Sequence, residues 1–369
     1  MASTTPQRKI DHLRLCCEAE VEFQRKTTLL EEVELVATAL PNLDPEEVDL
    51  SVDFLGRRLR APILIGALTG GAPGCERINR DLARVAAECG IGLALGSQRA
   101  MLESPDLTYT YKVRDLAPDI LLLGNIGLSQ ALQITPALAR TLMERVGADG
   151  LCLHLNAAME LCQKDGERRF HGALEAIGRL AAELGERLIV KETGCGMSRE
   201  DGLCLRQVGV VIVDVAGAGG TSWTRVERLR AGGPATPGGN VFDEWGIPTA
   251  ASLLELRGIG LRLIASGGLR SGLDFAKGIA LGAELSSAAL PFLRAHSRGG
   301  VEEVRRYTNA LISGLRMAAV LTGSRNLAAL RAVPKVITGR LREWLEQRNL
   351  GVRSARLVPR RPRPSTRSK

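Results

Sequence analysis

The sequence has few aromatic residues, no paired cysteine motif and no long hydrophobic run. Aromatic residues make up only 3% of the chain, which argues against a stacking platform for single-stranded nucleic acid. The eight cysteines form no C-x-x-C pair, so zinc-ribbon and dithiol redox motifs are absent. No apolar run approaches the length that spans a bilayer, and no signal peptide precedes the basic stretch QRKIDH. These absences predict a cytoplasmic protein without a nucleic-acid or membrane partner.

Composition and charge indicate a globular protein with one unusual end. Hydrophobic residues make up 45% and charged residues 24% of the chain, and its 369 residues suit one large α/β domain or two ordinary ones. The formal net charge of +8 suits an anionic small substrate. Residues 351–369 carry seven arginines and lysines and no acidic residue. This predicts a disordered basic tail, with RNA or membrane contact as the alternative.

Short apolar runs that end in glycine or polar residues recur eight times. Each run is continuously apolar, which is typical of strands buried on both faces, as in parallel sheets. Helical patterns separate the runs, for example over residues 75–90, where Gly90 is the expected C-cap. The runs cover residues 62–71, 90–98, 120–127, 150–156, 187–196, 209–220, 261–268 and 283–291.

Eight β–α units predict an α/β fold of the (β/α)8 TIM barrel type, with an open doubly wound sheet as the alternative. The barrel is favoured because polar residues follow nearly every run, and barrels keep their active sites at the C-terminal ends of the strands. We expect an N-terminal arm over residues 1–61 and the barrel with its C-terminal helices over 62–350. Those helices are expected at 300–322 and 338–348. The Gly- and Pro-rich connection 222–247 is a candidate active-site lid.

The stretch ASGGLRSG at 265–272 predicts a phosphate site. It follows the seventh run and opens a helix, and Gly267, Gly268 and Gly272 let backbone N–H groups approach an anion. A tight turn is the simpler alternative for a Gly-Gly pair. However, the loops after strands seven and eight are the usual phosphate site of barrels. The position therefore predicts a phosphate-bearing cofactor.

Polar groups at other strand ends outline a cofactor pocket. Ser97 and Asn125 are placed to hydrogen-bond the rim of a flat ring, and Thr221 suits a phosphate or a ring edge. Lys191 ends the fifth run, and because a buried lysine is rare unless paired, we expect it to meet a ligand or Glu192.

A second cluster follows the fourth run. His154 and Asn156 alternate on a strand and therefore face the same side. Glu160 is a hard oxygen ligand, suited to Mg²⁺ that bridges a diphosphate. Basic residues of the arm, at positions 8–12, would add positive charge, although composition alone favours a solvated terminus there.

These stretches together resemble type 2 isopentenyl-diphosphate delta-isomerase, the FMN-dependent family. The resemblance implies a (β/α)8 barrel that requires reduced FMN, usually reduced by NADPH, and Mg²⁺, and that forms a cytoplasmic homotetramer or homo-octamer. The implied activity interconverts isopentenyl and dimethylallyl diphosphates. The resemblance runs from about residue 8 to 345 and is carried by RKIDH, TTLLEEVELV, APILIGALTGG, INRDLARVAAECGIGLALGSQR, GNIG, HLN with Glu160, IVKETGCGMS, DVAGAGGTSW, DEWGIPTAAS and ASGGLRSGLDFAKGIALGAE.

The resemblance also implies roles for single residues. Met159 and Lys191 stand at catalytic positions, and Glu160 at the metal position. The diphosphate would meet Arg8, Lys9, Arg99, His154 and Asn156. The flavin would be held by Thr69, Ser97, Asn125, Lys191, Thr221, Gly267, Gly268, Arg270, Ala289 and Leu290.

Two positions depart from the family pattern. The reaction adds a proton at one carbon and removes one from its neighbour, and in the family reduced flavin is the implied proton carrier. Met159 stands where the family has glutamine, and a thioether cannot pass a proton effectively. Ser287 stands where the family tends to have glycine, beside the flavin phosphate. The alternatives are therefore a divergent enzyme for another prenyl or allylic diphosphate, and a non-catalytic flavoprotein.

Overall fold

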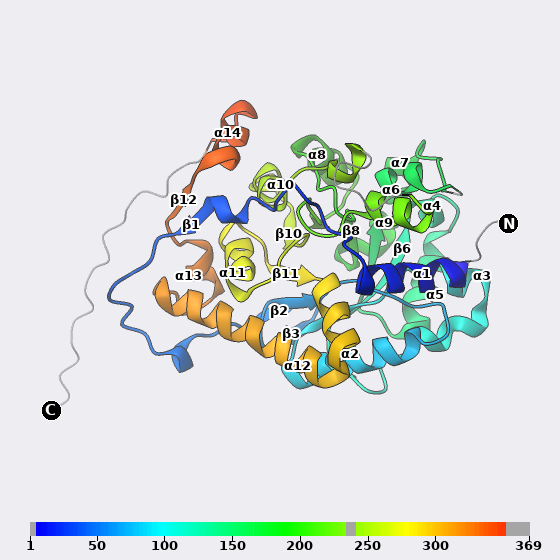
Figure 1. Ribbon diagram of the computed structural model, residues 1–369, viewed down its shortest axis with the longest axis horizontal. Coiled ribbons are helices and arrows are strands. Elements are labelled where there is room, and N and C mark those ends of the chain that lie inside the picture. The colour runs from blue at the N-terminus through cyan, green and yellow to red at the C-terminus, as the bar shows by residue number, and fades with distance from the viewer. Residues whose placement is uncertain (1–4, 165, 234–240, 352–369) are drawn as a thin grey trace.

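The computed structural model describes residues 5–164, 166–233 and 241–351, and its centre is a closed barrel of eight parallel strands (Figure 1). Each predicted apolar run supplies one strand, neighbouring strands pair in chain order, and the last strand pairs with the first. The predicted (β/α)8 barrel is confirmed, and the open sheet is excluded. The strands are β4 (Ile63–Ile65), β5 (Gly92–Ala94), β6 (Leu122–Gly127), β7 (Gly150–His154), β8 (Leu188–Lys191), β9 (Ile212–Asp214), β10 (Arg262–Ala265) and β11 (Leu285–Ala288).

Helices cover the outside of the barrel. The first of them ends at Gly90, whose φ of 65° is the left-handed conformation that glycine adopts readily. The longest begins at Leu290, before the predicted residue 300, and is interrupted at Gly299 and Gly300. The helices are α2 (Cys75–Cys89), α3 (Arg99–Glu103), α4 (Leu128–Ala131), α5 (Pro136–Val146), α6 (Ala157–Cys162), α7 (Ala173–Leu184), α8 (Arg199–Gln207), α9 (Trp223–Arg230), α10 (Thr249–Leu256), α11 (Gly272–Ala280), α12 (Leu290–Leu321), α13 (Leu327–Arg331) and α14 (Gly339–Gln347).

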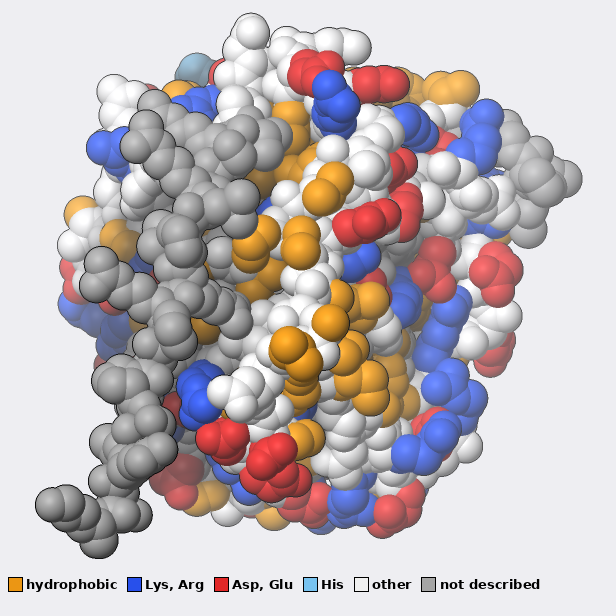
Figure 2. Space-filling model, turned by 90° about the vertical axis from the view of Figure 1, so that its left-hand side faces the viewer, with side chains coloured by type: hydrophobic (Ala, Val, Ile, Leu, Met, Phe, Trp, Pro, Cys, Tyr) orange, Lys and Arg blue, Asp and Glu red, His pale blue; other side chains and the backbone are white. Residues whose placement is uncertain are grey.

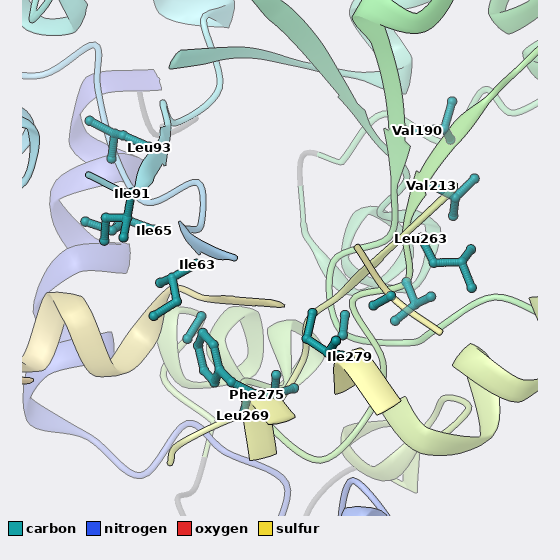
Figure 3. Packing of buried hydrophobic residues seen from close by; sticks show 14 of the residues in the cluster. Ile63, Ile65, Ile91, Leu93, Val190, Val213, Leu263, Leu269, Phe275 and Ile279 are labelled. Carbon is teal, nitrogen blue, oxygen red and sulfur yellow. The ribbon is translucent and has the colours of Figure 1, made fainter. Parts of the chain in front are cut away.

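Alternate residues of the strands pack on opposite sides of the barrel wall. Side chains such as Ile63 and Leu263 point outward and join Phe275 of α11 in the large cluster that Figure 3 shows in part. Their neighbours Leu64 and Ile264 belong to a separate cluster inside the barrel. The continuous apolarity of the runs follows from this burial on both sides.

The N-terminal arm fills one end of the barrel with a hairpin, β2 (Val52–Phe54) and β3 (Arg57–Leu59). Phe54 and Leu59 belong to the cluster inside the barrel. Arg57 forms an ion pair at 2.8 Å with Asp149, which directly precedes β7. The hairpin therefore closes the N-terminal end and leaves the C-terminal end for a site.

The start of the arm is helix α1 (Thr5–Glu18), and the solvated terminus favoured by composition is wrong. Figure 1 shows α1 (dark blue) beside α9, and α1 also contacts α12. Its Leu15 and Cys16 are buried in a cluster with Val226 of α9 and Leu293 of α12. Composition missed this because the apolar partners lie more than two hundred positions further along the chain.

The connection 222–247 is only partly a loop, because it contains α9 and a short 3-10 turn at Val241–Glu244. Residues 234–240 of this candidate lid, and residues 352–369 of the predicted basic tail, lie outside the described residues.

A second small sheet ties the arm to the C-terminal helices. Strand β1 (Val33–Leu35) pairs antiparallel with β12 (Lys335–Ile337).

Figure 2 shows the side of the molecule that is on the left in Figure 1, with hydrophobic side chains lying among charged ones. None of the described helices is long and apolar enough to cross a membrane.

Candidate active site

A cavity opens at the C-terminal ends of the barrel strands, bordered by α1. Its volume is about 260 Å³, roughly twenty times the space that one water molecule occupies by the same measure. Apart from Gly272, every residue that the sequence predicts to bind substrate, cofactor or metal lines it: Arg8, Lys9, Thr69, Ser97, Arg99, Asn125, His154, Asn156, Met159, Glu160, Lys191, Thr221, Gly267, Gly268, Arg270, Ala289 and Leu290.

Three titratable side chains lie side by side at one end of the barrel wall. His154, Lys191 and Asp214 are the last residues of β7, β8 and β9, and the strand register pairs each with its neighbour. Burial raises the pKa of Asp214, while the charge of Lys191 opposes that rise. The hydroxyl of Ser266 donates a hydrogen bond to Asp214. The strand ends thus hold a cation between an imidazole and a carboxylate.

His154 is neutral at physiological pH. Burial, together with the positive charges of Lys191 and Lys9, lowers the pKa of His154 to about 3. Its Nδ1 donates to Oδ1 of Asn125 at 2.9 Å, so Nε2 is left as an acceptor. A neutral ring held this way gains a proton only if an anion binds beside it.

Asn156, which directly precedes α6, and Glu160 of α6 form a buried pair. Nδ2 of Asn156 donates to one carboxylate oxygen of Glu160 at 2.9 Å, and the backbone N–H of Glu167 donates to the other at 2.7 Å. The sulfur of Met159 lies 3.9 Å from the same Asn156 Nδ2 and lines the cavity. A soft apolar atom therefore occupies the position beside this pair.

The side chain of Lys191 contacts the backbone of Glu192 and not its carboxylate. The ammonium group donates to the carbonyl oxygen of Glu192, and it makes no other hydrogen bond within the described part of the chain. The carboxylate of Glu192 instead accepts from the N–H groups of Thr193 and Gly194, at 2.6 and 2.7 Å, and of Cys195. Burial raises the pKa of Glu192 to about 7. The expected contact with Glu192 exists, but it leaves Lys191 facing the cavity.

Basic residues of α1 also border the cavity. Nζ of Lys9 donates to the carbonyl oxygen of Ser97 at 2.7 Å and contacts Oη of Tyr111 at 3.3 Å. Burial lowers the pKa of Lys9 to about 7. Burial and the nearby Arg99 also lower the pKa of Arg8. This side of the cavity therefore carries partly desolvated positive groups that an anion would stabilise.

Other basic residues of this region are engaged with the protein. Nε2 of His12 lies 2.7 Å from a carboxylate oxygen of Glu227, and Nε of Arg99 donates to Glu103 at 2.7 Å. His12 consequently joins α1 to α9, and we assign it no role in ligand binding.

In the predicted phosphate loop, Gly267 and Gly268 lie directly against the backbone of the glycine-rich loop at 217–219. Gly267 and Gly268 have φ of 96° and 77°, which a side chain rarely tolerates, and a Cβ atom at Gly267 would lie 2.1 Å from the carbonyl oxygen of Gly217. Ala289 and Leu290 add the N-terminus of α12 to the same side. Two glycine loops and a helix N-terminus therefore converge on one part of the cavity.

Gly272 does not belong to this loop site, which corrects the sequence prediction. It does not line the cavity, and a Cβ atom there would lie 2.5 Å from the carbonyl oxygen of Leu311. The glycine lets α11 pack closely on α12. Arg270 does line the cavity, but its guanidinium pairs with Glu22 of the arm.

Asn125, Thr69 and Ser287 are buried side chains that also line the cavity. Asn125 is fixed through its backbone N–H, which donates to Oε1 of the fully buried Gln98 at 2.9 Å. Oγ1 of Thr69 lies 2.9 Å from the sulfur of Cys75. Ser287 is buried on β11, and a Cβ atom at Gly66 would lie 3.0 Å from its hydroxyl oxygen. The Ser287 hydroxyl therefore occupies the narrow space beside the first strand.

Sequence reasoning missed several residues that line the cavity, among them Asp214, Trp223 and Gln163. Asp214 ends an apolar run in the same way as Lys191, and that signal could have found it. Trp223 lies in the part of the chain interpreted as a lid, and its indole packs edge-on against His12 at 5.2 Å. Gln163 follows α6, and its orientation depends on how that helix ends.

Comparisons with known proteins identify the family to which the chain belongs. A family model described as FMN-dependent dehydrogenase matches residues 1–104. The chain is 44% identical to the isopentenyl-diphosphate delta-isomerase of Methanosarcina mazei, covering 97% of this chain and 99% of that one. It is 48% identical to the enzyme of the same name from Synechococcus sp., covering 89% and 95%. The chain belongs to the isopentenyl-diphosphate delta-isomerase family.

Solved structures share the fold at much lower sequence identity. A flavocytochrome b2 variant with sulfite bound has a TM-score of 0.65 at 20% identity, over 97% of this chain and 89% of that chain. A mandelate oxidase variant with an FMN adduct has a TM-score of 0.59 at 18% identity, over 92% and 94%. At these identities the likeness to both structures establishes the barrel fold alone.

Proposed function

We propose that the chain is an FMN-dependent isopentenyl-diphosphate delta-isomerase, which interconverts isopentenyl diphosphate and dimethylallyl diphosphate. The observation that carries the proposal is the cavity in which a glycine-rich loop, a row of polar strand ends and several partly buried basic side chains meet. Family membership supports the same reaction.

The chemistry of the lining residues fits FMN. Gly267 and Gly268 leave backbone N–H groups and no side chains at the phosphate side, and the N-terminus of α12 favours an anion there. Ser97, Asn125 and Lys191 supply hydrogen-bonding groups for a flat heteroaromatic ring. When bound and reduced, with NADPH as the predicted electron donor, FMN supplies the proton-carrying group of the reaction, without net redox change.

A second group of lining residues fits a diphosphate and Mg²⁺. Arg8, Lys9 and Arg99 attract an anion, and His154 with Asn156 adds neutral polar contacts. Glu160 supplies a hard oxygen ligand of the kind that holds Mg²⁺ together with substrate phosphates. These residues bind and orient the substrate, while the cavity limits the water that would otherwise compete for protons.

The test is direct. Purified protein incubated with FMN, NADPH, Mg²⁺ and isopentenyl diphosphate is expected to form dimethylallyl diphosphate, detected by NMR. Glu160→Gln should sharply reduce this conversion because it removes a charged metal ligand, while FMN binding survives. A colourless preparation that stays apo in excess FMN, or a loaded protein without turnover, contradicts the proposal. Wild-type kinetics in Glu160→Gln at ordinary Mg²⁺ would show that Glu160 is structural.

A second candidate function follows from Met159. Its thioether makes the cavity beside Asn156 more apolar than a glutamine would, and an apolar lining suits a longer prenyl chain. Turnover of a larger prenyl or allylic diphosphate in preference to isopentenyl diphosphate would favour this candidate. Binding of both ligands without turnover of either would favour the non-catalytic flavoprotein. The cytoplasmic location and the homotetramer or homo-octamer stay predictions.

A further inference from the structure

One buried polar atom of a cavity residue has no hydrogen-bond partner among the described residues. The side chain of Gln163 is 2% exposed and lines the cavity. Its Oε1 accepts no hydrogen bond from any residue that the structure describes. A buried acceptor without a partner destabilises a fold, and such atoms are rare in native proteins. The atom therefore points to a ligand that carries a proton donor or a positive charge.

Gln163 is placed beside the carboxylate expected to bind metal. It directly follows α6, three residues after Glu160, and its backbone N–H donates to the carbonyl oxygen of Met159 at 2.9 Å. Each carboxylate oxygen of Glu160 already accepts one hydrogen bond from the protein. Oε1 of Gln163 thus adds an oxygen that accepts no hydrogen bond from the described residues, on a side chain that lines the same cavity as Glu160.

A Mg²⁺ ion bound in this cavity would need such an acceptor oxygen for its water ligands. Within the described residues, no group of three His, Cys, Asp or Glu side chains could hold a metal ion. Mg²⁺ bound by a single carboxylate and substrate phosphates keeps several water ligands, and each of these waters must donate its protons to an acceptor. A diphosphate oxygen cannot fill this role for Gln163, because both atoms are acceptors.

We propose that Gln163 is a positioning residue for the divalent cation. Its Oε1 accepts a hydrogen bond from a water molecule of the coordination shell that Glu160 and the diphosphate hold. This inference rests on the proposed function and extends its metal site by one residue.

The test measures Mn²⁺ binding to the FMN-loaded protein in the presence of inorganic pyrophosphate, by electron paramagnetic resonance. Gln163→Met keeps the length of the side chain and removes the oxygen, and Gln163→Leu is a second apolar variant. Both are expected to weaken Mn²⁺ binding about 10- to 100-fold, as the loss of an outer-shell partner typically does. Gln163→Glu restores an oxygen and should retain Mn²⁺ binding. Gln207→Leu, at an exposed glutamine of α8, is the matched control and should change nothing.

Thermal unfolding without Mn²⁺ separates this role from a structural one. Because Oε1 has no partner in the fold, Gln163→Met should leave the melting temperature unchanged or raise it. A lower melting temperature in both apolar variants, unchanged Mn²⁺ affinity, or no Mn²⁺ binding by the wild type overturns the proposal. Failure of the wild type to isomerise isopentenyl diphosphate overturns the proposed function instead, and leaves the Mn²⁺ comparison valid.

Discussion

At the residue scale, the polarity of the cavity changes sharply over a few side chains of α6. Asn156 and Glu160 form a hydrogen-bonded pair, while the sulfur of Met159 lies beside Asn156 and lines the same cavity. The pair can orient a charged group, whereas the thioether accepts a hydrogen bond only weakly and donates none. Replacing this one side chain therefore tests whether a polar group is needed there.

Met159→Gln is expected to raise the turnover of isopentenyl diphosphate. An amide can orient or pass a proton, and one positioned proton-transfer group typically contributes on the order of 10²- to 10⁴-fold in rate. Glutamine and methionine are similar in length, so the cavity should keep its shape. The measurement is steady-state turnover with reduced FMN and Mg²⁺, with Met317→Gln, at an exposed methionine of α12, as control. A wild type that is already fast, and no faster after the substitution, would show that the glutamine is dispensable.

Binding of a diphosphate is expected to take up protons. In the free protein burial lowers the pKa of Lys9 to about 7 and that of His154 to about 3, so at pH 8 both are largely neutral. A neighbouring anion favours their charged forms and raises both pKa values. Affinity for inorganic pyrophosphate should therefore fall as the pH rises above 7.

Titration calorimetry at pH 8, in two buffers of different ionisation enthalpy, measures this proton uptake. Lys9→Gln should reduce the number of protons taken up, whereas Lys112→Gln, at an exposed lysine, should not. Identical binding enthalpies in the two buffers would exclude the linkage.

At the scale of elements, the loops that follow the strands supply most of the residues that line the cavity. Only part of their geometry could be predicted from the sequence. The apolar runs predicted all eight strands, yet the run at 62–71 supplies only three strand residues, Ile63–Ile65. Residues 66–69 of that run leave the sheet and border the cavity. Hydropathy cannot separate these two parts, because both are buried.

Gly267→Ala is expected to disrupt the glycine-rich loop at 265–272 that is proposed to hold the FMN phosphate. The added Cβ would both strain a φ of 96° and collide with the carbonyl oxygen of Gly217. Gly258→Ala is the matched control, because Gly258 has a φ of 76° but open space around it, so it should cost only the strain of about 1 kcal/mol. Gly267→Ala should destabilise the protein further and weaken FMN binding by about ten-fold, ~1.4 kcal/mol, or more. Equal effects of the two substitutions on melting temperature and FMN affinity would contradict this.

At the scale of the whole molecule, the sequence predicted the barrel but not how the arm is used. The eight runs and the helical patterns between them are local signals, and local signals are what periodicity records. The hairpin around Phe54 and Leu59 and the docking of α1 depend on partners far away in the chain. Composition therefore indicated a solvated terminus where the structure has a packed helix. The resemblance to a known family, not the pattern of residues 8–12, placed Arg8 and Lys9 at the cavity.

Removal of residues 352–369 is expected to leave folding and FMN binding intact. The segment has no apolar periodicity, and the barrel and its hairpin are complete without it. Melting temperature and FMN affinity of the truncated and full-length proteins are the measurements. A large fall in either after truncation contradicts the prediction.

The docking of α1 also bears on the order in which the molecule assembles. His12 meets Glu227 across 215 positions of sequence, and Arg294 donates to the backbone of Cys16 across 278. Contacts of such high contact order form slowly, because a long loop must close before they contribute any stability. Helix α1 is therefore among the last segments to dock. We expect the cavity to stay open on the α1 side until the barrel has closed, so that the cofactor can enter from that side during folding.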